Sequence, residues 1–315
     1  MKKILILLSL ILLTCVTFSQ VTTYNLTITP RLIVHPISDV LTTVGDSTIV
    51  QCLNADTYSW STGETTADIT VYPTTTTTYT VTGTLNGKTL TKDAVVVFSI
   101  LPTDIDSCKL WLRADSIALG SVTTWTDLSG FNNDFTQSTA GNKPINTASE
   151  IGTHRGVVFD GTDDYLENTT IDNTLSMTMI VVWKADNQVT TNNVLWGGVD
   201  EYSPLIQQNT DDAVYVSPYT QATTDTSPFT AIYSIRYTSS TDCRMKRNGS
   251  TVFSGSINYG NYDNTGLYIG ANKNLSATYF LDGTILEIIK YNRVLTDDEE
   301  LILINSLNEY YNGIY

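Results

Sequence analysis

The chain has 315 residues, a length that predicts about two domains at the usual ~100–200 residues each. It carries 17 lysine and arginine residues against 32 aspartate and glutamate residues, a formal net charge of −15. Such an acidic protein lacks the positive surface that nucleic-acid backbones attract, and it suits anionic membranes poorly. Charged residues make up 16% and hydrophobic residues 41%, which predicts a folded, β-rich, extracellular type of protein rather than a disordered one.

Residues 1–19 have the pattern of a secretory signal peptide. Lys2 and Lys3 provide the charged start, residues 4–13 the apolar stretch, and residues 17–19 a small-x-small cleavage motif. The apolar stretch is too short to span a bilayer, and no later stretch reaches 18 apolar residues. We therefore expect cleavage near Ser19, no transmembrane segment, and a secreted, extracellular or cell-surface location.

Four cysteines are present, and Cys15 leaves with the signal peptide. Cys52, Cys108 and Cys243 remain, so at most one intramolecular disulfide can form. The expected pair is Cys108–Cys243, because both residues fall in one predicted domain. In the alternative, all three are small buried hydrophobic side chains. A lipoprotein would be anchored at Cys15, but Thr14 stands where glycine, alanine or serine is expected.

Residues 20–100 alternate apolar and polar side chains with a period of two, as in 47–53, 68–71 and 79–82. Asn86-Gly87 is a strong signal for a two-residue hairpin turn. Several short strands separated by turns predict a small β-sandwich.

Two aromatic residues of this region occupy positions typical of an immunoglobulin domain. Trp60 lies on the strand after Cys52, and Tyr79 lies two residues before Val81, where such a domain has its second cysteine. Because valine replaces that cysteine, we expect packing alone to hold the core. The run from Tyr58 to Val81 resembles the immunoglobulin-like modules of bacterial secreted and surface proteins, and the resemblance implies a spacer or adhesion unit.

Residues 101–104, Leu-Pro-Thr-Asp, predict a short linker, and residues 105–315 form a second, larger β-rich region. A hairpin is expected to turn at Asn248-Gly249. Other strands are predicted at 177–184, 231–237, 267–270 and 283–289.

The one convincing helix begins at Thr296. Thr296 and Glu299 have the spacing of a capping box, and Asp297 and Asp298 favour the positive end of the helix dipole. Strands over roughly 200 residues with a single helix predict a large sandwich of two sheets. The expected apolar face of the helix comprises Leu301, Ile304, Leu307 and Tyr311.

Six segments of the second region occur in the order found in a known family. They are 110–115 (LWLRAD), 125–130 (WTDLSG), 157–166 (VVFDGTDDYL), 268–270 (YIG), 280–287 (FLDGTILE) and 291–296 (YNRVLT). This region resembles the laminin G-like, concanavalin A-like lectin and glucanase family. The resemblance implies a curved jelly roll of two antiparallel sheets, with binding or catalysis on the concave face or in rim loops. The fold class expected is therefore all-β, a small immunoglobulin-like sandwich followed by a larger jelly roll with one C-terminal helix.

Catalysis by a glycosidase requires two carboxyl groups on either side of the scissile bond. Hydrolases of the resembled fold often place them on one strand as Glu-x-Asp-x-x-Glu, and this spacing is absent. Residues 297–300 are acidic but belong to the predicted helix, and Glu287 is expected to form a buried contact with Arg155 or Arg293. We assign no catalytic residue. A hydrolase site would therefore require acidic residues from separate strands to come together in the folded protein.

Two acidic turns are candidates for calcium, which takes six to eight oxygen ligands. One contains Asp160, Asp163 and Asp164, and the other contains Asp127 and Asn132. The resembled family often carries calcium near these segments. The alternative is that these residues simply form turns. No cofactor is required, and a structural calcium ion is the one candidate.

A sugar site needs aromatic rings for stacking and polar side chains for the hydroxyl groups. Predicted loops offer both, most densely at 257–264, although tyrosine is also an ordinary surface residue of strands. The candidate ligand-binding residues are Trp196, Tyr202, Tyr219, Tyr259, Asn261, Tyr262 and Asn264.

These observations favour a secreted or cell-surface, non-catalytic binding or adhesion protein whose jelly roll recognises a glycan or a cell-surface protein. The first alternative is a glycoside hydrolase of the concanavalin A-like fold. The second is a purely structural adhesion or assembly subunit, which the sequence does not separate from the favoured function.

Overall fold

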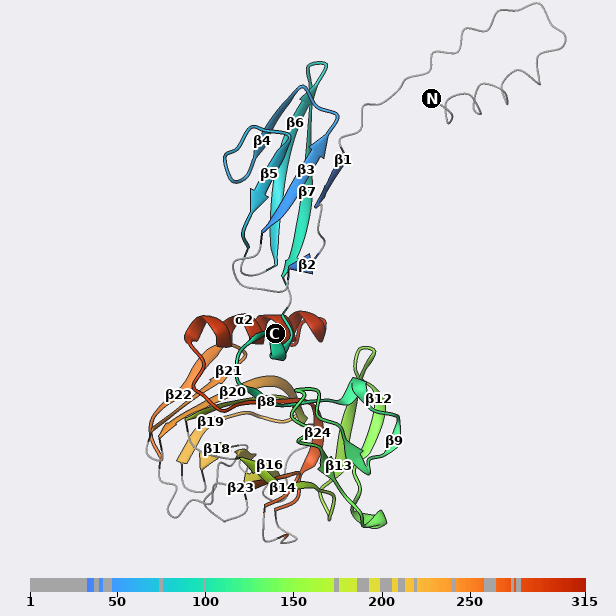
Figure 1. Cartoon of the computed structure of the whole chain (residues 1–315), viewed down its shortest axis with the longest axis vertical. Coiled ribbons are helices and arrows are strands. Elements are labelled where there is room, and N and C mark those ends of the chain that lie inside the picture. The colour runs from blue at the N-terminus through green and yellow to red at the C-terminus, as the bar shows by residue number, and fades with distance from the viewer. Residues whose placement is uncertain are drawn as a thin grey trace, which may run out of the picture.

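The computed structural model describes residues 33–36, 40–41, 47–73, 76–98, 100–172, 176–185, 193–198, 206–208, 213–217, 220–239, 242–257, 265–272, 275 and 279–315. The signal peptide expected at 1–19 lies outside these residues. The protein is all-β, as the sequence predicts, and among the described residues it has one α-helix (Figure 1). No helix in this part of the chain is long and apolar enough to cross a membrane.

The first part of the chain forms two small sheets, with strand orders β1-β3-β5 and β2-β7-β6-β4. Their strands pair antiparallel, except for the parallel pair β2 and β7. The strands are β1 (Ile33–Pro36), β2 (Val40–Leu41), β3 (Thr48–Leu53), β4 (Thr57–Trp60), β5 (Asp68–Val71), β6 (Thr77–Leu85) and β7 (Lys88–Phe98).

Alternation of apolar and polar residues makes these strands a sandwich. Val50, Cys52 and Val81 are fully buried, and Trp60 is nearly so. The long hairpin β6–β7 turns at Asn86 and Gly87 with φ angles of 52° and 75°, the left-handed geometry that favours Asn-Gly. The predicted β-sandwich and hairpin are therefore confirmed.

The second part forms two larger antiparallel sheets. One sheet has the order β22-β21-β20-β15-β24-β13-β12-β9, with β8 also paired to β24. The other has the order β10-β11-β14-β23-β16-β17-β18-β19. The first of these sheets comprises β8 (Cys108–Arg113), β9 (Gly120–Ser121), β12 (Ile145–Ile151), β13 (His154–Asp160), β15 (Met177–Ala185), β20 (Phe229–Ser239), β21 (Asp242–Arg247), β22 (Ser250–Ser256) and β24 (Asp282–Tyr291). The second comprises β10 (Thr124–Trp125), β11 (Phe135–Thr136), β14 (Leu166–Asp172), β16 (Asn193–Gly198), β17 (Ile206–Gln208), β18 (Ala213–Ser217), β19 (Thr220–Thr224) and β23 (Thr265–Ile269).

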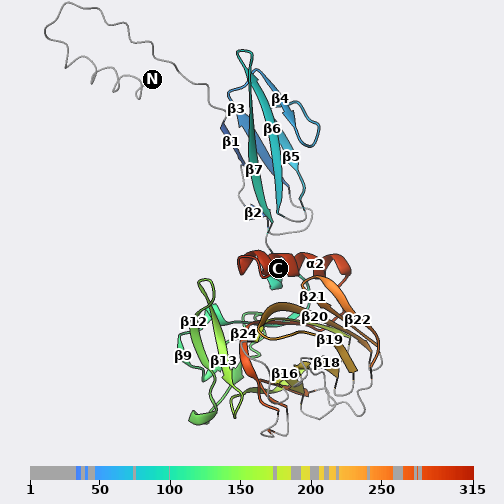
Figure 2. The same ribbon diagram turned by 180° about the vertical axis from the view of Figure 1, so that it is seen from behind.

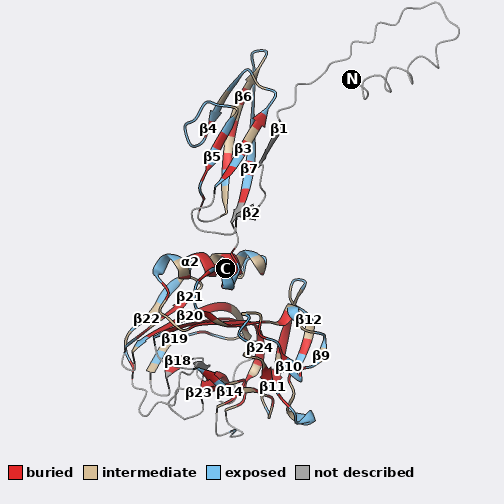
Figure 3. Ribbon diagram, viewed as in Figure 1, coloured by how far each residue is buried: buried red, intermediate tan, exposed pale blue. Residues whose placement is uncertain are grey.

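Two apolar layers stabilise this second part, one on each face of the nine-stranded sheet. Figure 3 shows that the strands of this sheet carry many of the buried residues. The inner layer fills the space between the two sheets and includes the fully buried Trp125 and Trp183. The outer layer lies beneath helix α2 (Asp297–Tyr310), with Ile180 and Val182 of β15 in it. Coverage on both faces explains why β15 is a nearly continuous apolar run rather than an alternating one.

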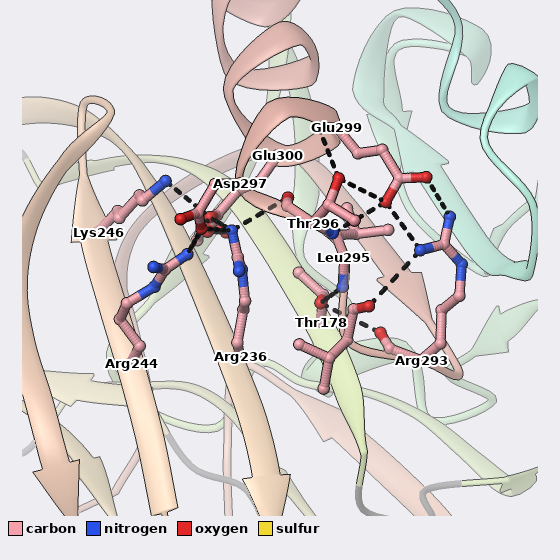
Figure 4. Close-up of polar contacts among 12 residues, drawn as sticks. Thr178, Arg236, Arg244, Lys246, Arg293, Leu295, Thr296, Asp297, Glu299 and Glu300 are labelled. Atoms are coloured by element: carbon pink, nitrogen blue, oxygen red, sulfur yellow. Dashed lines mark hydrogen bonds and ion pairs between the residues drawn. The ribbon is translucent and has the colours of Figure 1, made fainter.

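Helix α2 begins with the predicted capping box (Figure 4). The backbone N–H of Glu299 donates to Oγ1 of Thr296 at 3.3 Å, and the backbone N–H of Thr296 donates to Oε2 of Glu299 at 2.9 Å. Arg293 also pairs with Glu299 at 2.7 Å, so the start of the helix is fixed to the end of β24.

The first turn of α2 is held to the sheet by ion pairs that its sequence pattern does not reveal. Glu300 is fully buried and binds Arg236 of β20, together with Arg244 at 3.0 Å and Lys246 at 2.8 Å of β21. Asp297 binds the same two arginines. The acidic turn therefore does more than favour the helix dipole, because it compensates three cations on the outer face of the sheet (Figure 4).

The two parts meet at the layer beneath and beside α2. Figure 2 shows the first sandwich standing over the helix, on the side opposite the eight-stranded sheet. The backbone N–H of Ile100 donates to Oγ of Ser306 at 3.2 Å, and the hydroxyl group of Tyr291 donates to the carbonyl oxygen of Pro102 at 2.8 Å. The segment predicted to be a linker is thus hydrogen-bonded to the second part at Pro102 and at Ile100, the residue that precedes it.

The expected Cys108–Cys243 disulfide is wrong, because both residues are free and buried. Strands β24, β15 and β20 lie between β8 and β21 in the sheet. Four strand steps separate the two cysteines by roughly 19 Å, far beyond the span of a disulfide. Their thiols also face different layers, Cys243 the inner one and Cys108 the outer one. Burial raises the pKa of Cys108 to about 12, so this thiol stays protonated.

Candidate functional site

Two neighbouring cavities open beside strand β14 and the loop that precedes β11. Each has a volume of about 290 Å³, and they share Thr170. The amide cavity is lined by Asn132, Asp134, Thr136, Glu167, Asn168, Thr169 and Thr170. The lysine cavity is lined by Lys109, Phe131, Asn133, Thr170, Ile171, Asp172 and Asn292. We call the two together the β14 groove.

A tightly bonded turn positions one wall of the groove. Oδ1 of Asp127 accepts hydrogen bonds from the backbone N–H groups of Trp111 and Ser129, each at 2.9 Å. Oδ2 of Asp127 accepts from the hydroxyl group of Ser129 at 2.7 Å and from the N–H of Asn133 at 2.9 Å. Asp127 therefore organises the loop from beneath, and residues 131–133 are presented at the surface in a fixed conformation.

An irregular stretch of β14 forms the opposite wall. Pairing with β23 shifts register between Asn168 and Asp172, the irregularity of a β-bulge. Oδ1 of Asn168 accepts from the N–H groups of Thr170 and Ile171, both at 2.9 Å, and its Nδ2 donates to the carbonyl oxygen of Asp134 at 3.0 Å. One side chain thus both shapes the bulge and connects it to the loop across the groove.

Phe131 stands at the rim of the lysine cavity with 53% of its surface exposed. The ammonium group of Lys109 lies 3.5 Å from the centre of its ring, a cation–π contact. The contact orders both side chains. An exposed aromatic ring held in this way offers a flat apolar platform next to hydrogen-bonding groups.

The floor of the lysine cavity rests on a buried lysine. Lys290 is fully buried, and its ammonium group donates to the carbonyl oxygen of Asp172 at 2.8 Å and to Oδ1 of Asn292. Nδ2 of Asn292 in turn donates to a carboxylate oxygen of Asp172 at 2.8 Å. The pKa of Lys290 is lowered to about 8, mainly by burial; the charge of Asp172 opposes this shift and the charge of Lys109 adds to it.

Of the residues predicted to bind sugar, Trp196 is the one that the structure describes, and that prediction is wrong. Its side chain is fully buried in the inner layer, on β16. The strand pattern could not tell which sheet face the ring occupies. The other six predicted residues, Tyr202, Tyr219, Tyr259, Asn261, Tyr262 and Asn264, lie outside the described residues.

The two candidate calcium turns differ in the structure. Carboxylate oxygens of Asp160, Asp163 and Asp164 lie within 4.8 Å of one another. Burial raises the pKa of Asp164 to about 6, and repulsion from Asp160 and Asp163 adds to the effect. Three converging oxygens under mutual repulsion fit part of a calcium shell.

The second turn is explained without a cation. Both oxygens of Asp127 accept hydrogen bonds from donors of its own loop and of β8. Asn132 instead lines the amide cavity. Among the described residues, Asp127 does not belong to a cluster of three or more acidic, histidine or cysteine ligands.

Glu287 is a structural residue at the centre of a buried cluster. It is fully buried and accepts hydrogen bonds from Nε1 of Trp111 at 2.6 Å and from the hydroxyl group of Tyr311 at 2.7 Å. Arg113 donates to it twice, at 3.0 Å and 2.9 Å. The cluster joins β8, β24 and the end of α2.

The two arginines expected to pair with Glu287 bind elsewhere, which corrects that prediction. Arg155 donates to the carbonyl oxygen of Ile117 at 2.6 Å, and Arg293 pairs with Glu299. Glu287 pairs with Arg113 because β24 and β8 are neighbours in the sheet. The separation of residues along the sequence does not reveal which strands are neighbours.

Sequence reasoning missed most of the β14 groove. Phe131 stands between Gly130 and Asn132, so an aromatic residue within a turn signal was the available clue. No local sequence pattern marked Lys109 of β8 or Asn292, which directly follows β24. These residues are far apart in the sequence and meet only because the two strands pair.

No family model and no curated protein matches this chain. Solved structures resemble it distantly. Trypanosoma rangeli sialidase in complex with 2,3-difluorosialic acid has a TM-score of 0.49 at 13% identity, covering 65% of this chain and 34% of the sialidase. This chain thus spans about a third of the sialidase's length.

Two shorter structures are similar at the same level. Domain 4 of AbnA, a GH43 extracellular arabinanase from Geobacillus stearothermophilus, in complex with arabinotriose, has a TM-score of 0.44 at 15% identity, covering 64% of this chain and 98% of that one. The binding domain of Paraclostridial Mosquitocidal Protein 1 has a TM-score of 0.48 at 15% identity, covering 67% of this chain and 54% of that one. Likeness this weak supplies no argument about function.

Proposed function

We propose that the second part of the chain binds carbohydrate in the β14 groove and does so without catalysis. The observation that carries the proposal is Phe131, exposed and held in place at the rim of the lysine cavity, next to the amide cavity. Sugars present an apolar C–H face and a ring of hydroxyl groups. A flat aromatic ring suits the first, and amide, hydroxyl and carboxylate groups in the cavities suit the second.

The rigidity of the groove supports this proposal. Asp127 and Asn168 fix the two walls through hydrogen bonds to backbone N–H groups. A preformed site spends less of its binding free energy on ordering side chains and loops. Weak ligands such as short oligosaccharides therefore gain most from such a site.

Substitution of Phe131 tests the proposal. Oligosaccharide binding is measured by calorimetry for the wild type, for Phe131→Ala and for Tyr72→Ala, whose side chain is 66% exposed in the first sandwich. We expect Phe131→Ala to lower affinity about tenfold and Tyr72→Ala to leave it unchanged. Equal affinity of Phe131→Ala and the wild type would place the sugar elsewhere. Tyr259→Ala and Tyr262→Ala test the site expected from the sequence.

A hydrolase is the second candidate, because Asp134 and Glu167 both line the amide cavity. Two carboxyl groups from separate elements are the arrangement by which a glycosidase site would arise in this chain. Release of reducing sugar from a polysaccharide panel, lost in Glu167→Gln, would establish the enzyme. Binding without turnover supports the lectin-type function. Binding to another protein alone would support the structural adhesion or assembly role.

We also propose that the protein is secreted after cleavage near Ser19, and that residues 20–100 and 105–315 are separate domains joined by 101–104. Both proposals come from the sequence pattern. Mass spectrometry of the protein recovered from culture medium tests the first, since the mature chain should begin at Gln20. A precursor that stays intact within the cell would contradict it.

A further inference from the structure

The two halves of the β14 groove differ in charge, because two carboxylates line the amide cavity while one carboxylate and one ammonium group line the lysine cavity. Asp134 and Glu167 line the amide cavity, and no lysine or arginine joins them there among the described residues. Lys109 lines the lysine cavity, with the ammonium group of Lys290 buried beneath Asp172 and Asn292. The electrostatic environment therefore changes along the groove, from acidic in the amide cavity to less acidic in the lysine cavity.

The lysines of this half form no direct ion pair. In the described part of the chain, neither Lys109 nor Lys290 forms a salt bridge with a carboxylate, although the charge of Asp172 favours the charged form of Lys290. Lys290 donates instead to carbonyl oxygens, and Asp172 accepts from the side-chain amide of Asn292. Asp127, beneath the loop, accepts from four donors of its surroundings. The lining of the cavity thus holds one ammonium group and one carboxylate, and the ammonium group of Lys290 lies buried beneath Asp172 and Asn292.

The two lysines also disfavour each other. The charge of Lys109 lowers the pKa of Lys290, which burial already lowers. An anionic group in the lysine cavity would pair with the ammonium group of Lys109 and lessen its repulsion of Lys290. The ring of Phe131 at the same rim would hold the sugar that carries that group.

We propose that the lysine cavity binds the anionic substituent of a sugar, a carboxylate or a sulfate, while the amide cavity holds a neutral neighbouring sugar. This inference rests on the proposed function and specifies its ligand class. The carboxylates of Asp134 and Glu167 would repel a second anion. The groove therefore selects polysaccharides in which charged and neutral sugars alternate, and it fixes the direction in which the chain lies.

The net charge of −15 opposes this preference only at long range. At about 0.15 M salt the Debye length is about 8 Å, so distant acidic groups are largely screened while groups in contact are not. Binding is therefore measured at that ionic strength. A polyanion that binds there does so through local contacts.

Tetrasaccharides of equal length separate the contribution of an anionic group, and of its spacing, from that of the sugar rings. Hyaluronan carries a carboxylate on alternate sugars, κ-carrageenan carries a sulfate on alternate sugars, polygalacturonate carries a carboxylate on every sugar, and cellotetraose carries no charge. We expect at least one alternating anion to bind about tenfold more tightly than cellotetraose and than the polygalacturonate fragment. The comparison of hyaluronan with κ-carrageenan identifies the carboxylate or the sulfate as the recognised group.

Lys109→Met is the decisive variant, because methionine keeps an apolar stem against Phe131 and removes the charge. Affinity for the preferred anion should fall about tenfold, and affinity for cellotetraose should fall less, because the neutral ligand loses only the ordering of Phe131. Lys143→Met is the matched control, since Lys143 bonds Thr123 outside the groove and should alter neither affinity. Phe131→Ala should weaken both ligands.

The outcomes separate this inference from the proposed function. Equal binding of neutral and anionic ligands, or a Lys109→Met variant that discriminates as the wild type does, overturns the inference and leaves carbohydrate binding intact. Absence of binding to any tetrasaccharide overturns the proposed function and the inference with it.

Discussion

At the scale of single residues, removal of one member of a buried ion pair is expected to be strongly destabilising. Glu287 accepts hydrogen bonds from three side chains and is fully buried, whereas Arg113, its ionic partner, is 15% exposed. Removing one charge of such a pair leaves the other buried without compensation. The sequence did predict a buried polar role for Glu287, and it failed on the partner because strand order decides which arginine lies next to it.

Glu287→Gln should therefore lower the free energy of unfolding by about 3–5 kcal/mol, measured by urea denaturation. The matched control is Glu150→Gln, whose pair with Lys184 has side chains 18% and 25% exposed and should cost less, because water reaches both charged groups. A Glu287→Gln variant no less stable than Glu150→Gln would show that the cluster contributes nothing beyond a partly exposed ion pair.

Lys290 makes stability depend on pH in a defined window. Burial lowers its pKa from 10.5 in the unfolded chain to about 8 in the folded one. Between these values the unfolded state binds more protons, so the free energy of unfolding rises with pH. The destabilising effect of the buried charge is complete below pH 8 and disappears towards pH 10.5.

Comparison with Lys290→Met isolates this effect from other groups. The free energy of unfolding of the wild type minus that of the variant should increase by up to about 1.4 kcal/mol per pH unit between pH 8 and 10. Denaturation at pH 7, 8, 9 and 10 gives the four values needed. A difference that stays constant over this range would mean that Lys290 titrates normally.

At the scale of elements, local signals predicted the structure well and contacts between distant elements were missed. The capping box of α2 and the turns at Asn86-Gly87 and Asn248-Gly249 depend on neighbouring residues, and all three are present. The ion pairs of Glu300 and the packing of Trp196 depend on which strands lie side by side. Alternation of apolar and polar side chains shows that successive residues of a strand lie on opposite faces of the sheet. It does not show which face packs against another sheet or helix.

The turn after β13 is the element whose stability should respond to calcium. Calcium bound by Asp160, Asp163 and Asp164 would offset their repulsion and bind the folded state alone. A concentration of 100 times the dissociation constant should raise the melting temperature by roughly 5–10 °C. Asp164→Asn should abolish the shift, and Asp68→Asn, in the first sandwich, should preserve it. Melting curves of the wild type that coincide in calcium and in chelator would reject the site.

At the scale of the whole molecule, the junction between the two parts is ordered. Beside the bonds of Ile100 and Pro102, the hydroxyl group of Thr76 donates to Glu309 of α2 at 2.8 Å. The apolar layer under α2 continues through Ile100 and Ile105 into the first sandwich. The sequence predicted a short linker here, and the burial of Pro102 and of the flanking Ile100 and Ile105 follows from packing that the linker residues alone do not reveal.

We expect the two parts to move as one body, with Ile100 as a main contact. Ile100 is 6% exposed and its neighbour Leu101 is 46% exposed. Ile100→Ala should destabilise the protein by about 2–4 kcal/mol and broaden the particle dimensions seen by small-angle X-ray scattering. Leu101→Ala should change neither. Identical scattering and stability for both variants would contradict an ordered junction.

The central claim, that sugar binds in the β14 groove, is tested most directly by the backbone-amide NMR spectrum of the full chain during titration with an oligosaccharide that binds. The account predicts saturable shifts at Phe131, Asn132, Asn168 and Thr170, on the two walls of one groove. Saturable shifts confined to residues 258–264, or to the acidic turn at 160–164, with the groove signals unmoved, would contradict it.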